Sequence, residues 1–463
     1  MRRDRVMMRW VYSWVLWLMQ PLYRRKLLRR ARQEPGYAHA IAERFGYYRS
    51  PWPRGAGATV WVHAVSLGET RAARILIDNL RKLWPGMRLL LTHGTATGRA
   101  AGLGLLAPGD VQVWLPWDTP GAVRRFLAHF RPDIGVLMET EVWPNLVHAC
   151  HAQDLPLTLV NARMSPASLK RAQRLAWLSK PAYRRLSAVW AQTEDDARRL
   201  RALGAPVRGV FGNLKFDATP DLRQLAVGHA WRKRLRKPVV MLASAREGEE
   251  AMLLDCLKSF KLPTDAVSAQ GTPKKGAFEL AHWLIVPRHP QRFDAVAAMI
   301  ESHGWTVLRR SQWDDQGPVS QSGKVRPGVP CIWLGDSLGE MATYYALADV
   351  ALLGGSFEPL GGQNLIEAAA CACPVIMGPH TFNFAEAAKL AQDCGAALRV
   401  THMAHAVRAA LEWVCDDEAL DNALQATQIF ARRHQGAGGQ YAMAIRNLWR
   451  DTQDRRAGTT AAR

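Results

Sequence analysis

Short apolar runs alternate with stretches of helical periodicity over most of this chain. The first run, residues 60–65, is rich in β-branched side chains and ends at Ser66 and Gly68, and a helical pattern begins at Arg71. Comparable runs follow at residues 87–92, 111–115, 134–138, 157–160, 188–191, 207–211, 239–243, 283–286, 305–308, 332–334, 350–353 and 374–377. This rhythm predicts an α/β fold with doubly wound, mainly parallel sheets.

The rhythm is interrupted near the middle of the chain. Residues 218–237 contain Pro220 and a basic stretch, and the alternation of strands and helices then starts again. At 463 residues, the chain is also too long for one ordinary hydrophobic core. We therefore predict a domain at residues 33–217, a linker at 218–237 and a second domain of similar size at 238–450, with a cleft between the domains.

Other segments of the second half depart from the rhythm. Residues 261–279 and 311–329 are polar and rich in Ser, Gly, Pro or Lys, which predicts loops. The last strong helical pattern, at residues 440–449, could pack back across the linker. We expect residues 451–463 to form a frayed tail.

The first 32 residues have a pattern of their own. An apolar run at residues 10–19 contains Trp10, Trp14 and Trp17 and lies between two clusters of arginines. The run is half of the roughly 20 residues that a spanning helix needs. Tryptophan and arginine together favour a basic amphipathic anchor on an anionic membrane surface. A buried helix is the alternative, and a short spanning helix stays open if neighbouring residues extend the run.

Charge and cysteine content narrow the classes of partner. The formal net charge is +21, from 61 Lys and Arg against 40 Asp and Glu, which favours nucleic acid, anionic lipid or phosphorylated ligands. Basic residues beyond the N-terminal segment are not interleaved with aromatic ones, so we expect no nucleic acid partner. The seven cysteines include no CxxC pair, which indicates reduced thiols and no zinc site.

Charged residues follow several predicted strands of the first half. Glu69, Glu139 and Lys215 come just after the runs at 60–65, 134–138 and 207–211. Parallel strands bring such positions to one edge of the sheet, where α/β proteins bind ligands. A base, a supporting carboxylate and a cation would suit glycosyl transfer. Each residue alone also has a structural interpretation, such as a helix N-terminal charge for Glu69.

The second half carries a glycine-rich segment at residues 354–367, between a predicted strand and a helix. Such a segment lets a phosphate approach the backbone and a helix N-terminus, although it matches neither the Walker nor the dinucleotide fingerprint. A plain strand-to-helix loop is the alternative. Glu367 could accept hydrogen bonds from a ribose, and Arg288 could pair with a phosphate or carboxylate. Residues 338–340 open another helix after a strand.

Ordered motifs add a family resemblance that covers nearly the whole chain. The chain resembles the 3-deoxy-D-manno-octulosonic acid (Kdo) transferases of lipopolysaccharide synthesis. The matching motifs are ERFG at 43–46, HAVSLGE at 63–69, METEVWPN at 138–145, NAR at 161–163, GNLKFD at 212–217, EGEE at 247–250, VPRHP at 286–290 and GPHTFNF at 378–384.

The resemblance implies a GT-B fold, in which two Rossmann-like domains flank a cleft. The first domain would bind the acceptor and the second CMP-Kdo. The implied reaction is an inverting transfer of Kdo to the tetraacylated, bis-phosphorylated lipid A precursor, without metal or cofactor. It would take place at the cytoplasmic face of the inner membrane, where the basic N-terminus would meet anionic lipids. Glu69 would be the base, and Glu139 and Lys215 would stabilise the transition state.

The resemblance also implies a set of donor-binding residues. These residues, which would hold CMP, are Pro287, Arg288, Leu338, Gly339, Glu340, Asn364, Leu365, Ile366 and Glu367. The chain departs from the family at Gln363, where many members have a histidine, and a glutamine cannot become charged. Two alternatives stay open: a GT-B enzyme that uses a UDP-sugar on another lipid, and a membrane-tethered nucleic-acid-binding protein.

Overall fold

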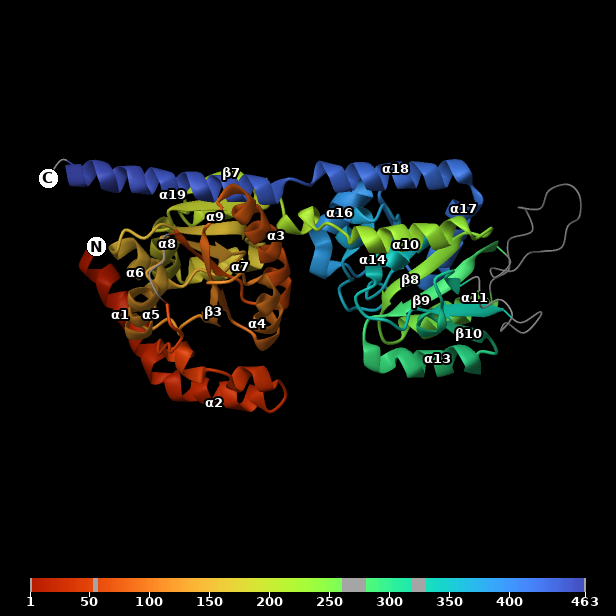
Figure 1. The fold of residues 1–463 in the computed structure, drawn as a ribbon, viewed down its shortest axis with the longest axis horizontal. Coiled ribbons are helices and arrows are strands. Elements are labelled where there is room, and N and C mark those ends of the chain that lie inside the picture. The colour runs from red at the N-terminus through yellow and green to blue at the C-terminus, as the bar shows by residue number, and fades with distance from the viewer. Residues whose placement is uncertain (1, 53–56, 260–279, 319–329, 462–463) are drawn as a thin grey trace, which may run out of the picture. The chain divides into compact units, whose positions relative to one another are not determined.

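The computed structural model describes residues 2–52, 57–259, 280–318 and 330–461. The chain forms two compact units (Figure 1). Unit 1 comprises the chain up to Asp217 and again from His434, and unit 2 comprises Ala218–Arg433. The predicted loop at 261–279, and the predicted loop at 311–329 from residue 319 onward, lie outside the described residues.

Unit 1 is built on a parallel sheet of seven strands. They are β1 (Thr59–His63), β2 (Arg88–His93), β3 (Val111–Trp114), β4 (Ile134–Met138), β5 (Leu157–Ala162), β6 (Ala188–Ala191) and β7 (Val207–Val210). Their order in the sheet is β3-β2-β1-β4-β5-β6-β7. The chain builds outward from β1 to β3 and then returns to place β4 beside β1. The switch point of this sheet therefore lies between β1 and β4.

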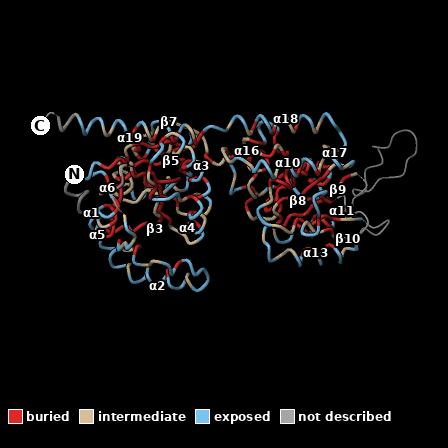
Figure 2. The backbone as a smooth tube through the Cα atoms, viewed as in Figure 1, coloured by how far each residue is buried: buried red, intermediate tan, exposed pale blue. Residues whose placement is uncertain are grey.

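Helices cover both faces of this sheet. They are α3 (Leu67–Leu83), α4 (Ala96–Gly102), α5 (Pro120–Phe130), α6 (Pro144–Ala152), α7 (Pro166–Arg174), α8 (Ala176–Arg184), α9 (Glu194–Ala202) and α19 (Ala437–Ala461), with short 3-10 turns that include η4 (Leu214–Asp217). One hydrophobic core joins the sheet to α3 and α19, and another joins it to α5, α6 and α9. The strands are buried because both faces are covered, whereas the N-terminal helices are largely exposed (Figure 2).

The N-terminal segment forms helices α1 (Arg2–Leu18) and α2 (Gln20–Ala31). One side of α1 docks on unit 1 through polar groups: the Tyr12 hydroxyl donates to Asp118 at 3.0 Å. Its other side leaves Trp10, Trp14 and Trp17 57%, 61% and 60% exposed. The segment is therefore neither a buried helix nor detached from the unit. Of the helices in the described residues, none has the length and apolar character needed to cross a membrane.

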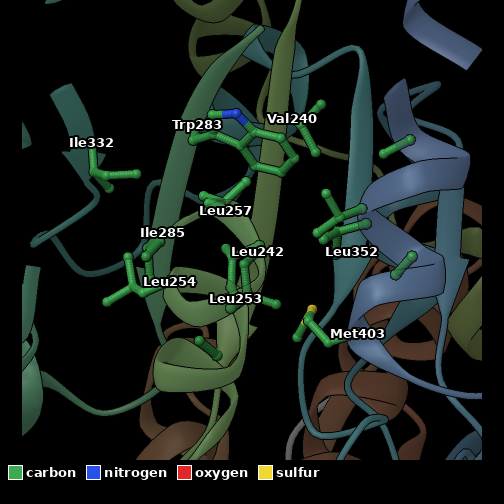
Figure 3. Close-up of a cluster of buried hydrophobic side chains, with 14 of the residues drawn as sticks. Val240, Leu242, Leu253, Leu254, Leu257, Trp283, Ile285, Ile332, Leu352 and Met403 are labelled. Carbon is green, nitrogen blue, oxygen red and sulfur yellow. The ribbon is translucent and has the colours of Figure 1, made fainter. Parts of the chain in front are cut away.

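Unit 2 repeats the architecture with a second parallel sheet of seven strands. They are β8 (Val239–Ala245), β9 (His282–Pro287), β10 (Thr306–Arg309), β11 (Cys331–Leu334), β12 (Val350–Leu353), β13 (Val375–Met377) and β14 (Ala397–Arg399), in the order β10-β11-β9-β8-β12-β13-β14. The helices are α10 (Leu222–Lys233), α11 (Glu249–Ser259), α13 (Phe293–Ser302), α14 (Met341–Leu347), α15 (Leu365–Ala370), α16 (Ala385–Asp393), α17 (Met403–Cys415) and α18 (Asp417–Arg433). Figure 3 shows part of the core between the sheet and α11 and α17, which includes Trp283.

The structure divides the chain differently from the predicted ranges. Residues 222–233 of the predicted linker form α10, which packs against α14 of unit 2. Gly228 permits this close contact, because a Cβ atom there would lie 2.3 Å from the carbonyl oxygen of Thr343. Trp231 is 3% exposed and belongs to the core rather than to a solvated linker.

The C-terminal residues also differ from the prediction. Residues from His434 belong to unit 1, and the predicted tail continues α19 as a helix to Ala461. Tyr441 is fully buried, and its hydroxyl bonds to the carbonyl oxygens of Ala191 and Gly212 at 3.2 and 2.9 Å. The expectation that the helix at 440–449 returns to the first unit is thereby confirmed.

Candidate active site

Glu69 lies at the carboxyl end of β1, beside the switch point of unit 1. Ser66 caps α3, and its hydroxyl accepts from the Glu69 N–H at 3.4 Å and donates to the Glu69 carboxylate at 3.2 Å. The carboxylate also accepts from the Val65 N–H at 2.8 Å. These reciprocal bonds resemble a capping box, so the start of the helix fixes the carboxylate at the mouth of the strand.

The surroundings of Glu69 bring the pKa of its carboxyl group close to neutral pH. Its pKa is raised from 4.5 to about 7. Burial is the largest cause, and the carboxylates of Glu139 and Glu141 also raise the pKa, whereas the hydrogen bonds from the Val65 N–H and the Ser66 hydroxyl lower it. The side chain is only partly buried, so a ligand could still reach it. A carboxylate with this pKa can accept a proton at physiological pH, as a general base must.

Glu139 follows β4 on the other side of the switch point and is 5% exposed. Its φ is 54°, a left-handed conformation that is uncommon outside glycine and that clusters at functional sites. The Glu139 N–H donates to Val160 at 3.0 Å, and the Glu139 carbonyl accepts from Arg163 at 3.3 Å. The side chain forms ion pairs with Arg163 at 3.0 Å and with Lys215 at 4.0 Å.

Lys215 lies in η4, a turn held by neighbouring elements. Asn161 accepts from the Leu214 N–H at 3.1 Å, and Asn213 accepts from the Lys215 N–H at 3.0 Å. The carboxylate of Asp217 accepts from the N–H groups of Gly436, at 2.6 Å, and of Gly438. The returning C-terminal segment therefore braces the turn that presents Lys215, and unit 1 brings all three predicted catalytic residues to one edge of its sheet.

The structure adds neighbours that we did not predict as site residues. Arg163 pairs with Glu139, although its own side chain is 57% exposed. Glu141 lies nearby, burial raises its pKa, and it accepts from the Trp143 indole at 3.0 Å. Asn161 is fully buried with a φ of 50°. All of these residues lie at or just after the end of a strand, which is the signal that identified Glu69.

In unit 2, the glycine-rich segment packs closely against β8. A Cβ atom on Gly354 would lie 2.4 Å from the carbonyl oxygen of Ser244, so only glycine fits there. Glu249 is 0% exposed and accepts from the N–H groups of Gly355 at 2.7 Å and Phe357 at 3.0 Å. Part of this segment is therefore explained by packing, as in the plain-loop interpretation.

Two groups of predicted donor-binding residues follow β9 and β11. Pro287 ends β9 and is buried, whereas the side chain of Arg288 is exposed. Leu338 is 69% exposed, and Gly339 has a φ of 78°. Glu340 is held by Arg310 at 3.0 Å and by the Ser337 hydroxyl at 2.5 Å.

The third group follows β12 at the start of α15. Asn364 caps the helix by accepting from the Ile366 N–H at 3.2 Å. Leu365 and Ile366 are 1% and 2% exposed, so they can offer a ligand only backbone groups, whereas Glu367 is partly exposed. The three groups follow the parallel strands β9, β11 and β12, so they lie at the same edge of the sheet.

The cysteines are all free. Within the described ranges, no three or more His, Cys, Asp or Glu side chains are grouped so that they could hold a metal ion.

Solved structures with the same architecture identify the fold. A glycosyltransferase from Rickettsia africae superposes with a TM-score of 0.51 at 11% identity, over 86% of this chain and 99% of that one. A UDP-GlcNAc 2-epimerase from Neisseria meningitidis also gives 0.51 at 14% identity, over 84% and 99%. At these identities the likeness concerns the fold alone, and the fold is that of the GT-B glycosyltransferases.

Sequence comparisons identify the family. Residues 39–218 match a family model described as 3-deoxy-D-manno-octulosonic-acid transferase (kdotransferase). A 3-deoxy-D-manno-octulosonic acid transferase from Bordetella pertussis is 45% identical, over 93% of this chain and 96% of that protein. One from Haemophilus influenzae is 30% identical, over 88% and 90%. The chain belongs to the 3-deoxy-D-manno-octulosonic acid (Kdo) transferase family.

Proposed function

We propose that the protein transfers Kdo from CMP-Kdo to the tetraacylated lipid A precursor, with inversion and without metal or cofactor. The supporting observation is the cluster at the switch point of unit 1, where a half-buried carboxylate with a pKa of about 7 lies near the Glu139–Lys215 pair. A base and a fixed cation are what an acceptor hydroxyl and a charged leaving group require.

In this mechanism Glu69 takes the proton from the acceptor hydroxyl. The acceptor oxygen then attacks the anomeric carbon of Kdo from the face opposite the nucleotide. The bond between that carbon and the phosphate oxygen breaks, and CMP leaves with the electron pair. Lys215 supplies positive charge to the transition state, and Glu139 holds the lysine in place.

Unit 2 would bind the donor at the carboxyl edge of its sheet. The exposed guanidinium of Arg288 suits the CMP phosphate, because a planar fork can donate two parallel hydrogen bonds. Leu338, Gly339 and Glu340 would contact the nucleotide after β11. Pro287 would support Arg288, and Asn364 to Glu367 would complete the site.

Incubation of the full chain with CMP-Kdo and purified lipid A precursor, followed by mass spectrometry of the lipid, tests the proposed reaction. We expect the mass to rise by whole Kdo units, equally with and without a chelator. No product, together with demonstrated UDP binding, would replace the proposal by the UDP-sugar alternative. Loss of product with chelator would contradict metal independence.

The exposed tryptophans of α1 support binding to a membrane surface, which we propose to be the cytoplasmic face of the inner membrane. Burial of one large apolar side chain contributes about 1.5–3 kcal/mol. A Trp14→Ser/Trp17→Ser variant, which keeps the Tyr12 contact with Asp118, should lose at least about tenfold in vesicle co-sedimentation. The control is Leu222→Ser/Ile429→Ser, because these apolar side chains of unit 2 are 73% and 61% exposed. Equal binding by both variants would exclude α1 as the anchor.

Deletion of residues 1–32 is a second test, and it should release the protein into the soluble fraction.

A further inference from the structure

Unit 1 has a pocket at the edge of its sheet opposite the candidate active site. The pocket has a volume of about 640 Å³. It lies around the amino ends of β5, β6 and β7, the ends of α6 and α8, and residues 448–456 of α19. Its charged side chains include Arg184, Arg185, Arg208, Arg455, Arg456 and Asp154. We call it the arginine pocket.

Two of these arginines have unused hydrogen-bonding capacity. Among the described residues, no hydrogen bond or ion pair engages the guanidinium of Arg184 or Arg208. Arg185 donates to the carbonyl oxygen of Pro181 at 3.1 Å, and Arg456 donates to the carbonyl oxygen of Asp154 at 2.6 Å. The pocket therefore concentrates positive charge and planar donors, which is the arrangement that binds phosphate.

The positive charge extends from the arginine pocket toward the N-terminal helix. The pKa of His148 is lowered by burial and then by Arg9, Arg185 and His151, of which the last lines the pocket. The pKa of Arg9, on α1, is lowered by burial and then by Arg185. Like charges that repel one another in this way would gain from a bound anion.

Apolar residues identify the class of anion. Leu155, Leu186 and Leu448 line the pocket together with the arginines, and its volume exceeds what a single phosphate ion needs. Helices α6 and α8, which contribute pocket residues, also pack against α1, whose other side carries the exposed tryptophans. A phosphate attached to an apolar group, close to a membrane surface, matches these features.

We propose that the arginine pocket binds the phosphate of an anionic phospholipid headgroup, at a site separate from that of sugar transfer. The lipid source rests on the proposed membrane position of α1, but the site does not depend on Kdo transfer. Two of its arginines would donate hydrogen bonds to the phosphate, while the leucines would contact the glycerol and the first acyl carbons.

Calorimetric titration of the full chain in a nonionic detergent tests this proposal, with short-chain dihexanoyl phosphatidylglycerol and inorganic phosphate as separate probes. The pocket variant is Arg184→Gln/Arg208→Gln. The control is Arg171→Gln/Arg174→Gln, which removes the same charge from exposed positions on α7. Arg208→Gln alone is a second pocket variant, because the stem of Arg184 packs on Gly204 and could affect folding.

We expect the pocket variant to weaken phosphatidylglycerol binding at least about tenfold and the control less than about twofold. The pocket variant should retain Kdo transfer, so this test can fail without the proposed function failing. Equal loss in pocket and control variants would overturn the pocket as the site. Equal affinity for inorganic phosphate and phosphatidylglycerol would overturn the lipid assignment and leave a free-phosphate site.

Discussion

The two sheets carry a glutamate at corresponding positions, and the two glutamates differ in how their oxygens are bonded. Glu69 follows β1 and Glu249 follows β8, and each of these strands borders the switch point of its sheet. Glu69 is partly exposed and accepts from one backbone N–H and one hydroxyl. Glu249 is 0% exposed and accepts from the N–H groups of Arg246, Gly355 and Phe357.

The position in the fold therefore places a carboxylate at the ligand edge but does not decide its role. Glu249 ties two loops together, because its oxygens are occupied by the backbone groups that those loops would otherwise leave unpaired. Glu69 keeps capacity for a proton, and its pKa of about 7 makes that capacity usable. The carboxylate of Glu249 therefore stabilises the fold, whereas that of Glu69 is available to accept a proton.

Replacement of the available carboxylate should have the largest effect. We expect Glu69→Ala to reduce Kdo transfer by about 10²–10⁴-fold, which is the usual contribution of a general base. Binding of CMP by unit 2 should be unchanged in calorimetry. Glu194→Ala, at an exposed first-turn position of α9, is the matched control and should transfer normally. Near-normal turnover of Glu69→Ala would remove it from the role of base.

The charge pair beside Glu69 should matter nearly as much. We expect Lys215→Met or Glu139→Gln to lower kcat by about 10²–10³-fold, because each removes fixed charge near the reacting atoms. The double variant should be little worse than either single one, since the 4.0 Å pair acts as a unit. Lys170→Met, at an exposed position on α7, controls for charge. Additive losses would show that the two residues act separately.

Glu249→Gln should affect stability rather than chemistry. Its amide NH₂ would face backbone N–H groups that are now bonded to the carboxylate, at a cost of about 2–4 kcal/mol. For a unit of this size, we expect Tm to fall by about 4–16 °C in circular dichroism. Glu247→Gln is the control, because that side chain is 56% exposed. An unchanged Tm with reduced transfer would place Glu249 in the chemistry instead.

A smaller effect is expected on folding stability, because the ionised form of Glu69 destabilises the folded protein. Its folded-state pKa of about 7 exceeds the ordinary value of 4.5, so the folded protein binds the proton more tightly. The stability contributed by that proton is present below the lower value and is lost as the pH rises through about 7. Glu69→Gln should therefore raise Tm at about pH 8 and leave it nearly unchanged at about pH 4. A variant that is less stable at both pH values would contradict this cost.

The sequence was most informative where strands are buried on both faces. The runs at 134–138, 188–191 and 350–353 coincide with β4, β6 and β12, because strands of a covered parallel sheet are continuous apolar runs. The edge strand β14 was missed, since its three residues carry little apolar signal. The return of the C-terminal segment to unit 1 depends on distant contacts, such as that between Tyr441 and Ala191, which local periodicity does not contain.

In the candidate site, too, the features that local sequence and topology determine could be predicted, and those that depend on distant contacts could not. Glu69, Glu139 and Lys215 could be predicted because topology alone brings strand ends together. The ion pair between Arg163 and Glu139 could not be predicted from the sequence, because it depends on a left-handed turn at Glu139. Nor could the backbone bonds of Glu249, which depend on the path of the glycine-rich loop.

The pH dependence of kcat/KM for Kdo transfer tests the role of Glu69 most directly. If Glu69 is the base, kcat/KM should fall about tenfold per pH unit below about pH 7 and level off above it, because only the ionised carboxylate accepts a proton. The residual activity of Glu69→Ala should lack this acidic limb. A wild-type profile that stays flat from about pH 5 to about pH 8, or a limb that persists in Glu69→Ala, would contradict the assignment.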